Sequence, residues 1–374
     1  MARFPKKIAY FAGQFYTQPM QSINANGYPI HFGPSGYEAL NQLIAHQKYS
    51  SVFIVTDSHS NDCCLPKFLP QLAVDIPIEI IEFESGESAK NINTCVEIWN
   101  ILTDLGADRK SLLVNLGGGV VTDLGGFVAS TFKRGIDFVN IPTTLLAMVD
   151  ASVGGKNGVD LGALKNQIGV INTPALLVID TSYLETLPQN EMRSGLAEML
   201  KHGLVYDKTY WEKFLDLAAI DFADFDALIY ESIAIKNAIV SQDPTENGIR
   251  KALNFGHTLG HAIESYFLES DDKETLLHGE AIAAGMVLEA FISWKKGLLT
   301  KREYAQVKAA IFAVFDPIPF VEKDYAPIFG LLIHDKKNEY GKVQFALLDG
   351  IGKIKIDQTV ENELIEAAFK NYKT

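Results

Sequence analysis

The sequence predicts a chain of two parts, an α/β domain with a parallel, Rossmann-like sheet followed by a mostly α-helical domain. In the first half, short apolar runs rich in β-branched residues alternate with helical patterns, which is typical of parallel sheets. One such run leads into three consecutive glycines and then a further helical pattern. After Leu187 the patterns become those of long amphipathic helices. We therefore predict domains over residues 1–181 and 182–374.

The individual elements follow from the spacing of apolar residues and from turn-forming residues at their ends. The first half is expected to contain strands at 51–56, 78–82, 111–116, 138–141 and 175–180, and helices at 37–47, 91–105 and 120–132. The second half is expected to contain helices at 190–204, 207–217, 223–240, 255–267, 279–294 and 301–312, with one late hairpin at 343–356. We expect the active cleft to lie between the two domains, where ligand sites are common.

Composition restricts the function classes. The chain has 374 residues, of which 47% are apolar, and this is enough material for two domains with a sizeable core. The net charge of −13 argues against nucleic acid or an anionic membrane as the main partner, because such partners require a basic surface. The apolar stretch 281–294 is interrupted by Glu289 and is too short to span a bilayer.

The cysteines and the N-terminal segment indicate the compartment. The chain has three cysteines, an odd number, and two of them are adjacent: Cys63, Cys64 and Cys95. This favours free thiols in a reducing cytosol over a disulfide framework. The basic segment 1–7 precedes an apolar run, 8–13, that is too short for a signal sequence. We therefore expect a soluble cytoplasmic protein.

A glycine-rich turn follows the predicted strand 111–116. Glycines at this position allow a diphosphate to approach backbone N–H groups at the positive end of a helix. Here the pattern is GxGxxT, without the usual third glycine, so a plain glycine-rich turn remains an alternative. Asp57 directly follows an earlier strand, where a carboxylate can bind ribose hydroxyls, and Glu87 and Lys90 follow the next strand. These three side chains could equally be solvated loop charges.

Several cations are placed beside glycine, asparagine or aspartate in the segment 134–166. They are Arg134, Lys156 and Lys165. A ligand that carries phosphate explains this cluster better than a solvated helical face does, because desolvated phosphate requires charge-assisted donors. The alternative is that Lys156 and Lys165 are ordinary loop lysines.

The segment 254–264 is a predicted helix start that carries potential metal ligands. Asn254 is expected to be the N-cap, and His257 and His261 are four residues apart, so both imidazoles lie on one face. Gly256 and Gly260 have the same spacing, and glycines inside a helix cost about 1 kcal/mol each, so a ring or a backbone is expected to pack on that face. A tight helix crossing with two hydrogen-bonded structural histidines is the alternative.

Two further segments of the second half add ligands. Glu198 lies among apolar residues, with Lys201 one turn later, and His278 opens another helical pattern. One carboxylate and two histidines from three helices are typical of a catalytic zinc site with an open position. Spacing alone favours His257 and His261 as the histidine pair, and it leaves the choice of ligands open.

Taken together, these motifs resemble the 3-dehydroquinate synthase family, which belongs to the sugar-phosphate cyclases. The similarity covers nearly the whole chain. It comprises GGGVVTDLGGFVAS, IPTTLLAMVDASVGGKNGVD, GALKNQIG, SGLAEMLKHG, NFGHTLGHAIE, LHGEAIAAGM and HDKKNEYGKVQFALL in the family's order.

The resemblance implies specific site residues. A divalent metal, zinc or cobalt, would be bound by Glu198, His257 and His278, while Glu246, His261 and Lys201 would be catalytic. Ser194 departs from the family, which has an asparagine there at the cofactor site. Contacts to NAD+ are implied for Asp57, Glu87, Lys90, Gly118, Gly119, Val120, Asp123, Thr143, Thr144, Lys165, Tyr183 and Thr186. Contacts to substrate are implied for Arg134, Asp150, Lys156, Asn166, Lys236, Arg250, Asn254 and Lys336.

The resemblance also implies a reaction and a homodimer, with Arg134 reaching the partner's site. The family converts 3-deoxy-arabino-heptulosonate 7-phosphate to 3-dehydroquinate and phosphate, a step of the shikimate pathway of aromatic amino acid biosynthesis, and restores NAD+ in each turnover. Three alternatives are a cyclase of the epi-valiolone or scyllo-inosose type, a metal-dependent polyol dehydrogenase, and a non-catalytic NAD-binding module. The match at Lys236, Arg250 and Lys336 favours the acidic substrate over a neutral sugar phosphate.

Overall fold

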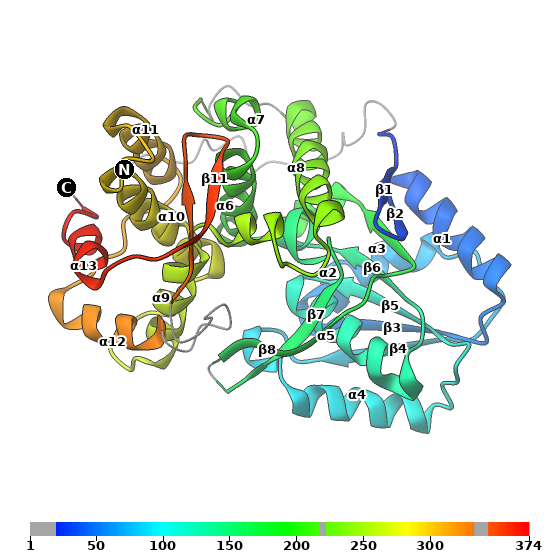
Figure 1. Ribbon diagram of the computed structural model, residues 1–374. Helices are drawn as coiled ribbons and strands as arrows, with labels where there is room; N and C mark the ends of the chain where they lie inside the picture. Colours follow the sequence, from blue (N-terminus) through cyan, green and yellow to red (C-terminus); the bar gives the residue numbers. More distant parts are fainter. Residues whose placement is uncertain (1–19, 163, 217–221, 333–342, 374) are drawn as a thin grey trace. The chain divides into compact units, whose positions relative to one another are not determined.

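The computed structural model describes residues 20–162, 164–216, 222–332 and 343–373 (Figure 1). Its described residues fall into two compact units. The sheet unit comprises residues 20–188, apart from residue 163, together with 222–237. The helical unit comprises residues 189–216, 238–332 and 343–373.

The sheet unit contains a seven-stranded, mostly parallel sheet with the strand order β1-β2-β9-β6-β5-β3-β4. Only the β1–β2 pair is antiparallel among these strands, and the predicted α/β class is therefore confirmed. Strands β1 and β2 were not predicted; β1 has only three residues, and β2 contains Pro29. The strands are β1 (Ile23–Ala25), β2 (Tyr28–Phe32), β3 (Val52–Asp57), β4 (Ile78–Phe83), β5 (Leu112–Gly117), β6 (Phe138–Pro142) and β9 (Leu176–Ile179).

Helices and short turns connect these strands. Helices α4 and α5 pack on the sheet through an apolar cluster that includes Phe53, Leu113 and Leu124. The helices are α1 (Pro34–Gln47), α2 (Ser58–Cys63), α3 (Leu65–Phe68), α4 (Ile92–Asp104) and α5 (Gly119–Thr131). The shorter turns are η2 (Leu69–Gln71), η3 (Glu87–Ala89), η4 (Phe132–Arg134), the π-helical η5 (Ala147–Ala151) and η6 (Thr181–Thr186).

A separate antiparallel hairpin, β7 (Lys156–Leu161) with β8 (Leu164–Ile171), also belongs to the sheet unit. It overlaps the segment 134–166, where the sequence analysis allowed Lys156 and Lys165 to be loop lysines. The hairpin forms because glycines allow its strands to approach closely. A Cβ at Gly158 would lie 2.6 Å from Ile168 O, and a Cβ at Gly169 would lie 2.6 Å from Asn157 O. The hairpin thus gives Lys165 and Asn166 fixed positions on β8.

The helical unit is built around α10 (His278–Lys295), which is buried along most of its length and contacts α6, α9, α11, α13 and β10. Its other elements are α6 (Gln189–Val205), α7 (Lys208–Glu212), η7 (Ile249–Asn254), α9 (His257–Glu269), α11 (Lys301–Phe312), α12 (Glu322–Leu332), α13 (Asn362–Lys370) and the hairpin β10 (Phe345–Leu348) with β11 (Ile354–Gln358). The remaining helix, α8 (Phe222–Gln242), has residues in both units.

The predicted helical second half and its late hairpin are confirmed, with two differences. Helix α7 ends at Glu212, before the predicted residue 217, because the chain turns over the next residues. Helices α12 and α13 were not predicted, and α12 contains Pro327, a residue that normally argues against a helix interior. Among the described residues, none of the helices has the length and apolar character that a membrane span requires.

Candidate active site

Close packing between α9 and α10 positions the histidine-bearing turn. A Cβ at Gly256 would lie 2.5 Å from Met286 Cγ, and a Cβ at Gly285 would lie 1.9 Å from Gly256 O. At Gly260 the added atom would meet Ala281 O at 3.1 Å. These glycines therefore allow two backbones to touch, and the predicted reason for glycine at 256 and 260 is confirmed. The first turn of α9 is held directly against α10.

The N-terminus of α9 is capped differently from the prediction. Asn254 is not the N-cap; it lies in η7, and its Nδ2 donates to Glu246 Oε1 at 2.9 Å. The N-cap is Gly256, whose φ of 79° is left-handed. The carboxylate of Glu289 accepts hydrogen bonds from Gly256 N at 2.6 Å and from Leu259 N at 3.1 Å. The fully buried side chain of Glu289, from α10, thus accepts hydrogen bonds from the N–H groups at the start of α9 that a local capping residue would normally bind.

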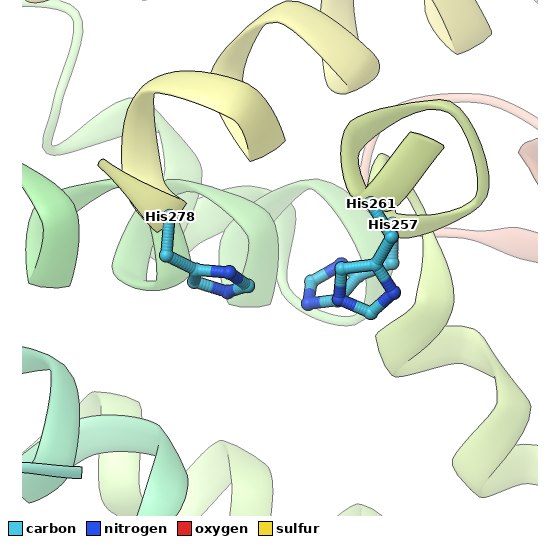
Figure 2. A group of neighbouring side chains, drawn as sticks. All are labelled: His257, His261 and His278. Carbon is cyan, nitrogen blue, oxygen red and sulfur yellow. The ribbon is translucent and has the colours of Figure 1, made fainter. Parts of the chain in front are cut away.

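Three histidines converge at this place. In Figure 2 the rings of His257 and His261, both from α9, face the ring of His278 at the start of α10. Their ring centroids are 5.1 to 5.8 Å apart, and one nitrogen of each ring lies within 4.8 Å of the others. Such a group of imidazoles can hold a divalent metal ion.

Glu198, from the middle of α6, adds a carboxylate to this cluster. Its Oε1 lies 3.5 Å from His257 Nε2 and 3.8 Å from His278 Nε2. The side chain is fully buried and forms an ion pair with Lys201, one turn later on α6. A buried carboxylate among imidazoles suits zinc or cobalt, which prefer nitrogen with oxygen donors. Both Glu198 and His261 are close enough to complete a set with His257 and His278.

Charges around His278 change its acidity. Burial lowers its pKa, but the neighbouring carboxylates of Glu264 and Glu198 outweigh burial and raise the pKa to about 10. Glu264 is the nearer of the two, with Oε2 lying 3.2 Å from His278 Nδ1. The site therefore favours positive charge on or beside this ring, as a cation-binding site requires.

In the helical unit, the predicted substrate residues Arg250 and Asn254 lie in η7, and the predicted catalytic residue Glu246 lies shortly before it. Arg250 is buried, and its Nη1 donates to Pro244 O at 2.5 Å. Glu246, which accepts the hydrogen bond from Asn254, has a left-handed backbone with φ of 62°. Lys336 lies outside the described residues.

In the sheet unit, the glycine-rich turn between β5 and α5 forms a helix N-terminus. Gly118 is the N-cap, and no side chain caps this helix within the described part of the chain. A Cβ at Gly118 would lie 3.0 Å from Thr144 Cγ2, while Thr143 N donates to Gly117 O at 2.9 Å. The predicted residues after β5 and β6 therefore meet at one sheet edge. Open backbone N–H groups there suit a diphosphate.

The missing third glycine has a structural explanation. In the usual fingerprint that glycine allows close packing between helix and strand. Here Gly125 and Gly126 fill this role, because a Cβ at either residue would lie 2.0 Å from a side-chain oxygen of Asn115 or Asn157. Thr122, at the third-glycine position, is buried and donates from Oγ1 to Gly119 O at 3.2 Å. The turn is thus built for close helix packing despite its unusual sequence.

The predicted charged residues of the sheet unit form one network. Lys90 is buried, and its Nζ lies 2.6 Å from Asp123 Oδ2 and 2.7 Å from Asn166 Oδ1. Burial lowers the pKa of Lys90, but the charges of Asp123 and Glu87 outweigh burial and raise it. Lys165 Nζ lies 2.6 Å from Glu87 Oε1. The alternative that these lysines are solvated loop charges is therefore wrong for Lys90 and Lys165.

Two more predicted substrate residues of the sheet unit pair directly. Lys236 Nζ lies 2.7 Å from Asp150 Oδ1 and 2.5 Å from Asp150 O, and Lys236 is buried.

Arg134 is exposed at the end of η4, with a left-handed φ of 71°. This conformation is uncommon for a residue that carries a side chain.

The remaining predicted residues lie in other parts of the sheet unit. Asp57 caps α2, with Oδ1 accepting from Ser60 N at 2.7 Å. Tyr183 is buried in η6 with its phenol oxygen 3.0 Å from the hydroxyl of Tyr37, and Thr186 Oγ1 donates to Tyr183 O at 3.3 Å. Lys156 is the first residue of β7. Gly119 and Val120 form the first turn of α5.

The fold of this chain is that of a class of enzymes with solved structures. One is 2-deoxy-scyllo-inosose synthase in complex with carbaglucose-6-phosphate, NAD+ and Co2+; it is 26% identical to this chain, with a TM-score of 0.82, and the match covers 94% of this chain and 99% of that one. Another is 2-epi-5-epi-valiolone synthase from Streptomyces hygroscopicus with NAD+ and Zn2+, also 26% identical, with a TM-score of 0.80 and coverage of 95% and 99%.

The sequence comparisons are more specific. The family models for the N-terminal and C-terminal parts of 3-dehydroquinate synthase match residues 80–194 and 195–338. The 3-dehydroquinate synthase of Parabacteroides distasonis is 41% identical over 341 residues, covering 89% of this chain and 94% of the relative. The chain belongs to the 3-dehydroquinate synthase family.

Proposed function

We propose that the protein is a phosphorus–oxygen lyase that converts 3-deoxy-D-arabino-heptulosonate 7-phosphate to 3-dehydroquinate and phosphate in the shikimate pathway. The observation that carries this proposal is the cluster of Glu198, His257, His261 and His278 on the family's motif-bearing helices, in a chain whose relatives at 35–41% identity are 3-dehydroquinate synthases. The solved enzymes with the same fold at 26% identity act as related cyclases.

The sheet unit is proposed to bind NAD+. The N-terminus of α5 would receive the diphosphate, since Gly118 leaves backbone N–H groups open there. The network of Glu87, Lys90, Asp123 and Lys165 would border the cofactor. Two solved structures of the same fold hold NAD+, which supports NAD+ as the cofactor. Bound NAD+ would supply reversible hydride transfer without being consumed overall.

The helical unit is proposed to bind one divalent metal, Zn2+ or Co2+, through Glu198, His257 and His278. Its chemistry would be that of a Lewis acid beside the hydroxyl to be oxidised. His261 would take the hydroxyl proton as a general base, and Glu246 would pass it on. The Lys201 ammonium, paired with Glu198, would favour negative charge on the substrate oxygens nearby.

The family resemblance implies that cations and amides would bind the substrate. Lys156, Asn166, Lys336 and the partner subunit's Arg134 are proposed to bind the phosphate, and Arg250 the carboxylate, for which a guanidinium is well shaped. The pair Lys236–Asp150 and the amide of Asn254 would hold ring hydroxyls. Oxidation of a ring hydroxyl to a ketone would acidify the C–H on the neighbouring carbon. Loss of this proton would allow the phosphate to leave by β-elimination.

Assembly and location are also proposals. A homodimer would bring Arg134 to the site of the partner subunit, and its exposed position is compatible with a contact outside its own subunit. The three free cysteines fit a reducing, cytoplasmic location.

The deciding experiment measures phosphate release by the metal-loaded protein with a catalytic amount of NAD+. Release from the heptulosonate phosphate, without net NADH, is the expected result. The neutral heptulose phosphate, which lacks the carboxylate, is run beside it. Release from the neutral sugar alone would indicate an epi-valiolone-type cyclase, and stoichiometric NADH would indicate a polyol dehydrogenase.

A further inference from the structure

Glu264 is a buried carboxylate on the helix that carries two of the clustered histidines. It follows His257 by seven residues and His261 by three, so the three side chains share one face of α9. The sequence-based ligand set does not use Glu264, and no proposed chemical step does so either. A carboxylate buried without a role in charge pairing would be costly.

The contact of Glu264 is specific. Its Oε2 lies 3.2 Å from His278 Nδ1, at the first residue of the neighbouring helix α10. On the other side of the same ring, Nε2 faces Glu198, whose Oε1 is 3.8 Å away. The two ring nitrogens of His278 therefore face two different carboxylates, each from a different helix.

Hydrogen-bond chemistry assigns the roles of these nitrogens. An ionised carboxylate can only accept, so Nδ1 must donate its proton to Glu264. In a neutral imidazole this leaves the lone pair on Nε2, the nitrogen that points into the cluster. The same contact restrains rotation of the ring about its Cβ–Cγ bond, because turning it would break the Nδ1–Glu264 hydrogen bond.

We propose that Glu264 is a positioning residue for the metal site, which fixes the tautomer and the orientation of His278 so that Nε2 is presented as a ligand. The inference rests on the proposed ligand set of Glu198, His257 and His278. Outer carboxylates of this kind strengthen the binding of the metal without touching it, typically by 10- to 100-fold.

The test measures the dissociation constant for Zn2+ of the full chain, by competition with a chromogenic chelator. Glu264→Ala is expected to weaken binding about 10- to 100-fold. Glu264→Gln is expected to weaken it less, because the amide oxygen still accepts from Nδ1 without the negative charge. Glu269→Ala, which removes an exposed carboxylate from the same helix, is the matched control and should bind Zn2+ as the wild type does.

Two further measurements separate the possible failures. The visible absorption of bound Co2+ reports the ligand geometry and should change in Glu264→Ala but not in Glu269→Ala. If Glu264→Gln and Glu264→Ala both bind Zn2+ within twofold of the wild type, the positioning role is wrong, even where thermal stability falls. Should Glu264→Ala not fold, the isosteric Glu264→Gln carries the comparison. If His257→Ala also binds as tightly as the wild type, the proposed ligand set itself is wrong.

Discussion

At the residue scale, His257 and His261 illustrate how neighbours with the same geometry can have different roles. They lie one turn apart on α9 with ring centroids 5.1 Å apart, and both reach the cluster. Spacing favours them as a ligand pair, whereas the family resemblance assigns only His257 to the metal. Glu198, close to His257 and His278, provides the third ligand in that assignment.

We predict that His257→Ala abolishes metal binding, because it removes a ligand, whereas His261→Ala retains the metal. Loss of a general base should slow turnover of the His261 variant by about 10²- to 10⁴-fold. Metal content by elemental analysis, together with turnover at saturating metal, checks both statements. Equal loss of metal in the two variants would contradict the ligand assignment.

At the element scale, the position of α9 depends on Glu289. Sequence shows this residue only as an interruption of an apolar stretch, yet its carboxylate accepts from two backbone N–H groups at the start of α9. A negative charge is also favourable at a helix N-terminus, where the helix dipole is positive. His257 is the first residue of this helix, so its position depends directly on the contact.

We predict that Glu289→Gln destabilises the protein by about 1–3 kcal/mol, since the amide cannot accept from both N–H groups. It should also weaken metal binding, because the His257 turn is no longer fixed. Chemical denaturation and Zn2+ titration check this. Thr300→Ala is the control: it removes the cap of α11, where Thr300 Oγ1 accepts from Glu303 N at 3.2 Å, and should lower stability while metal affinity stays unchanged.

A second buried carboxylate, Asp324, joins α12 to the end of α9. It accepts from Tyr266 Oη at 2.9 Å and pairs with Lys273 Nζ at 2.8 Å. Burial raises its pKa, but the hydrogen bonds from Lys273, Val321 N and Tyr266 outweigh burial and lower it. A carboxylate whose pKa is lowered by folding stabilises the folded state above its unfolded pKa of about 3.9, and this contribution is lost as the pH falls through the folded value.

We therefore predict that Asp324→Asn is less stable than the wild type at pH 7, by about 1.5–3 kcal/mol. The difference should begin to shrink as the pH falls below the unfolded pKa of about 3.9, and it should disappear as the pH passes the lower pKa of the folded carboxylate. Urea denaturation of both proteins over this pH range checks the prediction. A difference that stays constant with pH would show that the charge of Asp324 contributes nothing.

At the scale of the whole molecule, the proposed homodimer would let one subunit complete the site of another. Arg134 and His257 lie in different units, and each is proposed to be essential. If Arg134 acts on the partner's site, a dimer of one Arg134→Ala subunit and one His257→Ala subunit has one site in which both functional groups are intact.

We predict that Arg134→Ala and His257→Ala are each inactive, and that heterodimers formed by co-expression recover activity. Random assembly should give roughly one quarter of the wild-type rate per chain. Phosphate release by the mixed preparation checks this, with each variant alone as the control. Failure to recover activity in purified heterodimers would place Arg134 in its own subunit's site.

The sequence by itself determined the α/β and helical halves, five of the seven strands of the main sheet, and the family. These depend on local patterns, namely apolar periodicity, glycine spacing and motif order, which a chain carries whatever it packs against. The family resemblance of these motifs indicated Glu198, His257 and His278 as candidate metal ligands. The local patterns also indicated that Gly256 and Gly260 face a close neighbour.

Only the tertiary structure decided which side chains support that site. Sequence favoured Asn254 as the cap of α9, but Glu289, far along the chain, takes this role, and Glu264 meets His278 across two helices. Lys90 likewise reaches Asn166 on a hairpin that the sequence shows as a loop. The physical reason is that such contacts pair groups from distant segments, and a pattern within one segment cannot specify its partner in another.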